Sequence, residues 1–195
     1  MKRILFVLFC LLPGLTTAET FPALYDVTGV AADDVLNVRA NSSASAAKVG
    51  ELAHNAQNIE VVRVRNGWGL VNVGETAGWT SMRFLARQEE GDYALARALS
   101  CFGTEPYWSL KILQGSEARF YDPDGSTGYH AGLLQVSKNR TDRFAFAAQS
   151  LLAVIGRATC SDGMSDRQYG LTIDLWPDAT NSMEFYSGCC TMADF

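Results

Sequence analysis

Residues 59–73 read IEVVRVRNGWGLVNV, two runs rich in β-branched residues joined by the pair Asn66-Gly67. An Asn-Gly pair between apolar runs is a strong signal for a tight β-hairpin turn. Comparable short apolar runs precede and follow this stretch, and turn residues separate them at regular intervals. Such a pattern is typical of a small all-β unit. We therefore expect residues 21–86 to form one, with strands at 23–27, 35–39, 49–52, 59–64 and 68–73 before Gly78-Trp79 and Phe84-Leu85.

Five short motifs follow one another in this region: LNVR at 36–39, KVGEL at 48–52, NGW at 66–68, Gly78-Trp79 and Phe84-Leu85. In this order they resemble the bacterial SH3 domain, a small barrel of five to six strands. The resemblance implies a binding module, which in several family members recognises cell-wall peptide or peptidoglycan. We expect residues 21–86 to have this fold and to act by binding.

Alternate residues of a strand point to the same side of a sheet, so part of each strand is predicted to face the barrel core. The predicted core residues are Leu36, Val38, Val49, Leu52, Val61 and Val71. The candidates for ligand contact in this unit are Tyr25, Arg39, Trp68 and Trp79. Each tryptophan follows a glycine and either plugs the barrel or forms a platform for a ligand. Arg39 either staples a loop carbonyl or meets an acidic ligand.

The first 18 residues have the pattern of a cleavable secretory signal. Lys2-Arg3 is a basic start, residues 4–12 are apolar, and small residues occupy 16–18. We expect cleavage between Ala18 and Glu19 and a periplasmic or secreted location for the mature chain. Removal of Lys2 and Arg3 leaves 14 basic against 21 acidic residues, a net charge of −7. So acidic a chain is not expected to bind nucleic acid, and no later apolar run reaches the ~20 residues of a membrane span.

Four cysteines remain beyond the signal segment, and all lie in the second half: Cys101, Cys160, Cys189 and Cys190. An even number of cysteines in an exported chain predicts disulfides, here two. A bond between Cys189 and Cys190 would strain the intervening peptide, which also disfavours its complement, Cys101 with Cys160. Neighbouring side chains of an extended segment point to opposite faces. Cys189 and Cys190 are therefore expected to reach different partners, in either of the two remaining assignments.

Residues 87–100 are predicted to be a linker with a short helix, because Asp92 is a suitable N-cap before an Ala- and Leu-rich run. Short strands return in residues 101–195, and six or seven of them predict an antiparallel barrel or sandwich. The expected fold class is therefore all-β: an SH3-like small barrel followed by a second, disulfide-stapled antiparallel β-barrel or sandwich domain.

Three motifs mark the second domain: CFGTEPYW at 101–108, CSDGMSD at 160–166 and GCC at 188–190. In this order they resemble a family of uncharacterised exported bacterial proteins, which implies no particular reaction. The candidate ligand-binding residues here are Glu105, Trp108, Asp162 and Asp166. Glu105 beside two aromatic residues suits a cation or amine, or a hydrogen bond to nearby backbone amides. Trp108 is expected to close one barrel end, and the aspartates form either a substrate or metal site or a capped turn.

The sequence offers little for catalysis or for a metal. Its two histidines have no serine or cysteine at a catalytic spacing, and no G-x-S-x-G motif or paired Cys-x-x-Cys motif is present. We expect no cofactor or metal and a non-catalytic role, in which the SH3-like unit binds cell-wall peptide, peptidoglycan or an envelope protein. Two alternatives stay open: an envelope enzyme or enzyme inhibitor acting through the acidic residues of the second domain, and a structural or assembly factor.

Overall fold

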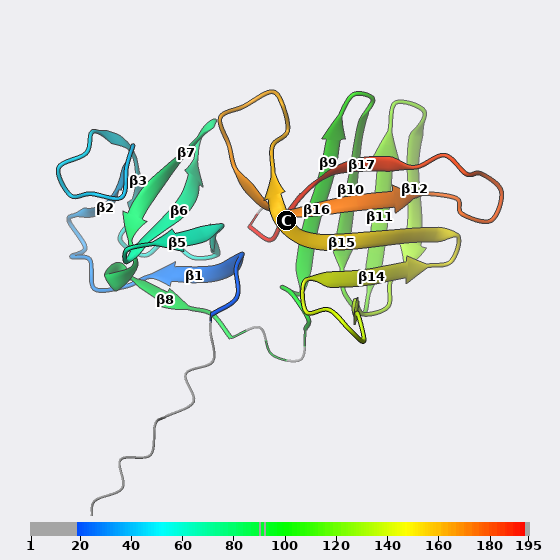
Figure 1. Cartoon of the computed structure of the whole chain (residues 1–195), viewed down its shortest axis with the longest axis horizontal. Helices are drawn as coiled ribbons and strands as arrows, with labels where there is room; N and C mark the ends of the chain where they lie inside the picture. Colours follow the sequence, from blue (N-terminus) through cyan, green and yellow to red (C-terminus); the bar gives the residue numbers. More distant parts are fainter. Residues whose placement is uncertain (1–18, 90, 92, 194–195) are drawn as a thin grey trace, which may run out of the picture.

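The computed structural model describes residues 19–89, 91 and 93–193. Within these residues the fold is all-β, and its one helical element is the short 3-10 turn η1 (Met82–Phe84). Figure 1 shows two β units, one from each half of the chain. The expected signal segment, Ala18 included, lies outside the described residues, and Glu19 is exposed at their start.

Two antiparallel sheets form the N-terminal unit, with strand orders β4-β1-β8 and β3-β2-β7-β6-β5. The Asn66-Gly67 pair joins β5 to β6, and both residues have positive φ, 51° and 76°. This conformation is what a tight hairpin turn requires. The strands are β1 (Ala23–Val27), β2 (Val35–Arg39), β3 (Lys48–Ala53), β4 (Ile59–Val61), β5 (Arg63–Arg65), β6 (Trp68–Val73), β7 (Thr76–Ser81) and β8 (Leu85–Arg87).

The core of this unit lies between its two sheets and contains five of the six predicted core residues. The prediction is wrong for Val49, which is 40% exposed. In the β2–β3 pair, Val38 lies opposite Gly50 and Arg39 opposite Lys48, so Val49 is an extra residue without a partner. A residue in such a bulge leaves the alternation of its strand.

The short helix predicted between the units does not form. Residues 93–97 are irregular, and β9 (Ala98–Thr104) already begins at Ala98, so the second unit starts before Cys101. Asp92, the predicted N-cap, lies outside the described residues. Leu95 and Leu99 are both fully buried in the core of the second unit. An isolated short helix is marginal in water, and burial of these two leucines stabilises the extended path instead.

The C-terminal unit is one nine-stranded antiparallel sheet, in the order β12-β11-β10-β9-β17-β16-β15-β14-β13. The sheet curves around its own core as a half-barrel (Figure 1), and its edge strands β12 and β13 are not paired with each other. The expected all-β fold with a second, disulfide-containing antiparallel unit is therefore confirmed, and the sheet of this unit is a half-barrel. The other strands are β10 (Tyr107–Leu113), β11 (Glu117–Asp122), β12 (Gly125–His130), β13 (Gln135–Val136), β14 (Arg143–Ala148), β15 (Leu151–Cys160), β16 (Tyr169–Trp176) and β17 (Tyr186–Thr191).

Both disulfides involve β17. Cys190 is bonded to Cys101, its direct cross-strand neighbour on β9, with the two Cα atoms 4.0 Å apart. Cys189 is bonded to Cys160 at the end of β15, with a Cα separation of 5.6 Å. The prediction that the two last cysteines reach different partners is confirmed. Two disulfides are compatible with an oxidising or extracellular compartment.

Candidate functional site

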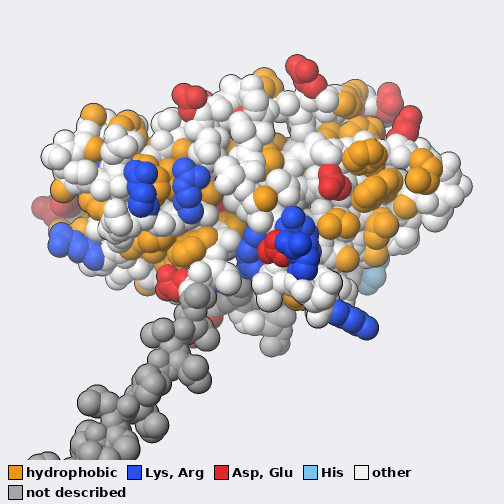
Figure 2. Space-filling model, in the orientation of Figure 1, with side chains coloured by type: hydrophobic (Ala, Val, Ile, Leu, Met, Phe, Trp, Pro, Cys, Tyr) orange, Lys and Arg blue, Asp and Glu red, His pale blue; other side chains and the backbone are white. Residues whose placement is uncertain are grey.

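The outer face of the five-stranded sheet carries aromatic and basic side chains together. Residues directly opposite one another in register share a face of a sheet. One row across β2, β7, β6 and β5 contains Arg39, Trp79, Leu70 and Arg63. The neighbouring row contains Ser81, Trp68 and Arg65. On the side of the N-terminal unit visible in Figure 2, basic side chains stand beside hydrophobic ones.

A cleft of about 660 Å³ opens beside Trp68 on this face. The β1–β2 loop, β2 and the η1 segment form its walls, and Trp68 is half-buried there. Of the predicted ligand residues, Arg39 and Trp68 lie in this cleft. Its lining consists of Gly29, Val30, Ala31, Asp34, Val35, Leu36, Asn37, Arg39, Ala44, Trp68, Ser81, Arg83 and Phe84.

Two arginines approach the cleft from different elements. Arg39 Nη1 donates a 2.8 Å hydrogen bond to the carbonyl oxygen of Ala46, which is one of the two roles predicted for it. A guanidinium has five N–H donors, so this bond leaves Arg39 able to act on the cleft as well. Arg83 is exposed, and its guanidinium lies 4.4 Å from the centre of the Phe84 ring. Arg83 is not among the residues predicted from the sequence, because only the η1 turn brings it to the cleft.

Two predicted ligand residues are inaccessible. Trp79 is 7% exposed, because the guanidinium groups of Arg63 and Arg65 lie 5.7 and 4.4 Å from its ring centre. Trp79 is thus a packing residue, and of its two predicted roles the ligand platform does not fit this burial. Tyr25 is 2% exposed in the core between the two sheets. The alternation of β1 turns Tyr25 inward, so its predicted ligand contact is wrong too.

The candidates from the CFGTEPYW motif lie apart from this cleft. Trp108 is 1% exposed in the half-barrel core, where its ring centre lies 6.2 Å from that of Phe120 and 5.9 Å from that of Tyr186. A ligand role for Trp108 is therefore excluded by burial. Glu105 is exposed in the two-residue turn between β9 and β10. Neither residue lines the cleft beside Trp68.

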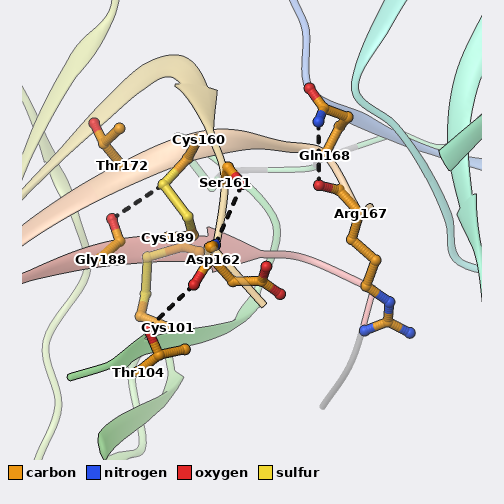
Figure 3. The surroundings of a disulfide bond; sticks show 12 residues. Cys101, Thr104, Cys160, Ser161, Asp162, Arg167, Gln168, Thr172, Gly188 and Cys189 are labelled. Atoms are coloured by element: carbon orange, nitrogen blue, oxygen red, sulfur yellow. Dashed lines mark hydrogen bonds between the residues drawn. A yellow bond between two sulfur atoms is a disulfide. The ribbon is translucent and has the colours of Figure 1, made fainter. Parts of the chain in front are cut away.

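Asp162 caps the turn of its own loop. Its Oδ1 accepts hydrogen bonds from the backbone N–H groups of Met164 and Ser165, at 3.0 and 2.9 Å. Its Oδ2 accepts one from Ser165 Oγ at 2.8 Å. The Asp162 carbonyl in turn accepts from Thr104 Oγ1 at 3.1 Å, next to the Cys160–Cys189 bond (Figure 3). Of the two predicted roles, the capped turn is the one that the contacts bear out.

These hydrogen bonds also set the charge of Asp162. Burial raises the pKa of its carboxyl, but the hydrogen bonds from Ser165 and Met164 outweigh burial and hold the pKa below its usual value. A carboxyl with a lowered pKa is poorly suited to act as a general acid near neutral pH. Asp166 is exposed, and its backbone N–H donates to the Glu75 carbonyl at 3.0 Å. In the CSDGMSD motif the side chain of Asp162 therefore caps the turn, whereas the contact of Asp166 is made by its backbone.

Comparisons with known proteins add nothing to these contacts. No family model, curated protein or solved structure matches the chain. In the described part of the chain, no group of three or more His, Cys, Asp or Glu side chains is placed to hold a metal ion. No helix among the described residues is both long and apolar enough to cross a membrane.

The loop after Cys160 joins the two units. The Asn72 side chain donates to the Gln168 carbonyl at 2.9 Å and accepts from the Gln168 N–H at 3.0 Å. Arg167 Nε donates to the Gly74 carbonyl at 2.7 Å. These contacts hold the far end of the β6–β7 hairpin, whereas Trp68 and the cleft lie at its near end. The C-terminal unit thus supports the hairpin that carries the candidate site.

A buried carboxylate completes this interface. Glu60 on β4 is only 6% exposed, and its Oε2 accepts hydrogen bonds from Thr191 Oγ1 and, at 3.0 Å, from the Met192 N–H. Glu60, like Arg83, is not among the residues predicted from the sequence. A glutamate between the apolar residues Ile59 and Val61 of a strand indicates a solvent-facing position, but contacts from the second unit bury it.

Proposed function

We propose that this chain is a non-catalytic exported binding protein of the bacterial cell envelope, whose SH3-like N-terminal unit binds cell-wall peptide or peptidoglycan beside Trp68. The observation that supports this proposal is the cleft beside Trp68. Its volume of about 660 Å³ lies in the range of small-ligand sites. A half-buried tryptophan, apolar loop residues and two arginines suit a short peptide that has both aliphatic and charged groups.

Export is part of the proposal. The basic, apolar and small-residue pattern of residues 1–18 supports a cleaved secretory signal. The two disulfides persist best in an oxidising compartment such as the periplasm or the cell exterior. We assign the C-terminal unit a positioning role, because its loop and β17 hold the N-terminal unit through Asn72, Gly74 and Glu60.

The test is a binding assay of the full mature chain on purified bacterial sacculi. Trp68→Ala removes the aromatic side chain at the cleft. Central aromatic anchors contribute about 2 kcal/mol or more to binding, so we expect at least a roughly tenfold weaker retention. Trp176→Ala is the matched control, because Trp176 is a partly buried tryptophan of the other unit, stacked on Phe185. It should leave retention unchanged.

The variants are compared at equal folded content, measured by far-UV circular dichroism and thermal unfolding. Wild-type chain that does not bind sacculi means that the cell-wall proposal is wrong. Wild-type chain that binds while Trp68→Ala binds equally well places the contact outside this cleft.

A further inference from the structure

Four arginines lie on or beside the outer sheet face. Salt bridges join other basic residues of the chain to acids: Lys48 to Glu51, Arg119 to Glu117, and Arg140 and Arg143 to Asp142. Among the described residues, no salt bridge forms at Arg39, Arg63, Arg65 or Arg83. A face with four such cations on a chain of net charge −5 favours an external anion.

These four arginines have different surroundings. Arg63 and Arg65 lie over the ring of Trp79, and Arg65 Nε also donates to Ser42 Oγ at 3.1 Å. Their part is to cover Trp79. Arg39 and Arg83 line the cleft itself, together with Trp68. Arg65 is the direct cross-strand neighbour of Trp68 and adds positive charge at that side.

We infer that the cleft binds a peptide through a carboxylate group, held by Arg39 and Arg83 over the apolar surface of Trp68. This inference rests on the proposed function and narrows its ligand to an acidic peptide. Arginine forms strong, often bidentate hydrogen bonds to a carboxylate because the two planar groups match. Asp34 is the one acidic residue of the lining, and its Oδ1 already accepts a hydrogen bond from the backbone N–H of Val35 at 2.7 Å.

The lining favours a carboxylate over a phosphate polymer. Only two of the lining residues are cations, and apolar residues such as Val30 and Phe84 also line the cleft. A polyphosphate chain needs a continuous track of positive charge, because each repeat carries its own charge. The net charge of −5 also repels a polyanion at long range. A peptide with a carboxylate and aliphatic groups matches both kinds of surface in the cleft.

The test follows the indole N–H signal of Trp68 in the ¹⁵N NMR spectrum of the full mature chain, assigned with Trp68→Phe. The probes are a hexapeptide of glutamate and one of glutamine, which differ in charge and hardly in shape. We expect a saturable shift with the glutamate peptide alone. Arg83→Gln should weaken that binding by about tenfold or more, because hydrogen bonds to charged groups are worth ~1.5–3 kcal/mol. Arg119→Gln, an exposed arginine of the other unit, should bind like wild type.

Three results would overturn the inference: no shift with the glutamate peptide, equal shifts with both peptides, or displacement of the glutamate peptide by a lower concentration of short polyphosphate. The last result would assign the cleft to phosphate groups. The sacculus assay distinguishes the two levels of the argument. Binding to sacculi without a glutamate response leaves the proposed function standing and the carboxylate inference wrong. A shift with the glutamate peptide without binding to sacculi leaves the carboxylate site standing and the cell-wall proposal wrong.

Discussion

Trp108 shows how two motifs that are distant in the sequence meet at one side chain. Gly103 lies directly opposite Trp108, and a Cβ atom there would sit 2.2 Å from the indole Nε1. A Cβ atom at Gly188 would sit 2.8 Å from Trp108 Cζ2 and 2.1 Å from the Phe102 carbonyl oxygen. The indole therefore extends from β10 across β9 to β17, and the glycines leave room for it. The motifs CFGTEPYW and GCC are parts of one packing arrangement.

The substitution Gly188→Ala tests this arrangement. Its methyl group would collide with backbone, which cannot rotate away, and overpacking of a core costs roughly 1–3 kcal/mol or more. We expect the free energy of unfolding to fall by at least that amount in chemical denaturation. Gly132→Ala is the control, because a Cβ atom at Gly132 would meet no atom within 4 Å. Equal stability of the two variants would contradict the packing of Trp108 described above.

Asp162 gives the chain a predictable response to acid. The pKa of its carboxyl is lowered in the folded state, where burial is outweighed by hydrogen bonds from Ser165 and Met164. Its stabilising effect is therefore present above the unfolded pKa of about 3.9 and is lost as the pH falls through the lower folded value. Asp162→Asn should lower the thermal midpoint at neutral pH, and the difference between the two chains should shrink in acid as the pH falls through the lowered pKa of Asp162. A constant difference across this range would show that ionisation of Asp162 is irrelevant.

The control for this pH series is Asp166→Asn. Asp166 is an exposed neighbour on the same loop, and the contact found for it uses its backbone N–H. Its replacement should change the midpoint little at either pH.

At the level of elements, β17 is the strand that ties the half-barrel together. It pairs with β9 on one side and β16 on the other, and its two cysteines bond in different directions. The Cys101–Cys190 bond spans 89 residues of sequence, whereas the Cys160–Cys189 bond spans 29. The second bond also anchors the base of the loop that contacts the first unit (Figure 3).

Removing each disulfide should therefore have a different cost. In the chain-entropy model the longer bridge is worth roughly 4–5 kcal/mol and the shorter roughly 3–4 kcal/mol. We expect the double variant Cys101→Ala/Cys190→Ala to lose more unfolding free energy than Cys160→Ala/Cys189→Ala, as measured in guanidinium chloride. The reverse order would mean that native-state contacts of the Cys160 loop outweigh loop entropy. Non-reducing peptide mapping of the wild type checks the pairing itself.

At the level of the whole molecule, the two units are joined by polar contacts as well as by the linker. Asn72 forms hydrogen bonds with the backbone of Gln168, and Arg167 donates one to the Gly74 carbonyl. The Glu60 carboxylate accepts a hydrogen bond from the Met192 N–H, directly after β17. Hydrogen bonds of this kind fix an orientation between units, because each donor must meet its acceptor at a set geometry. The N-terminal unit is therefore held at β4 and at the β6–β7 turn, away from the cleft.

Glu60→Ala tests the importance of this junction. It leaves the Thr191 hydroxyl and the Met192 N–H without their acceptor, and an unsatisfied buried group costs roughly 1–3 kcal/mol. We expect faster hydrogen–deuterium exchange at Met192 and faster proteolysis between residues 88 and 97. Glu75→Ala is the matched control, because Glu75 is exposed and contributes its carbonyl, not its side chain, to the interface. Unchanged exchange at Met192 in Glu60→Ala would contradict a stabilising junction.

Local patterns were sufficient for the strands of the N-terminal unit and for the cysteines. The β-branched runs at 35–39 and 68–73 became strands with those bounds, and Asn66-Gly67 became the hairpin turn. Alternation along β17 separated Cys189 from Cys190. These features depend on neighbouring residues alone, since turn geometry and strand alternation are properties of the local backbone.

The accessibility of each side chain was decided only by the tertiary structure. Trp68 and Trp79 each follow a glycine in the sequence, yet Trp68 lines the cleft while Arg63 and Arg65 cover Trp79. Leu95 and Leu99 are not helical as predicted, because the core of the second unit buries both side chains. Glu60 became a buried acceptor because β17 of the other unit lies on it. The burial of a side chain depends on contacts with residues from remote parts of the chain, and the local pattern of apolar and polar residues does not specify these contacts.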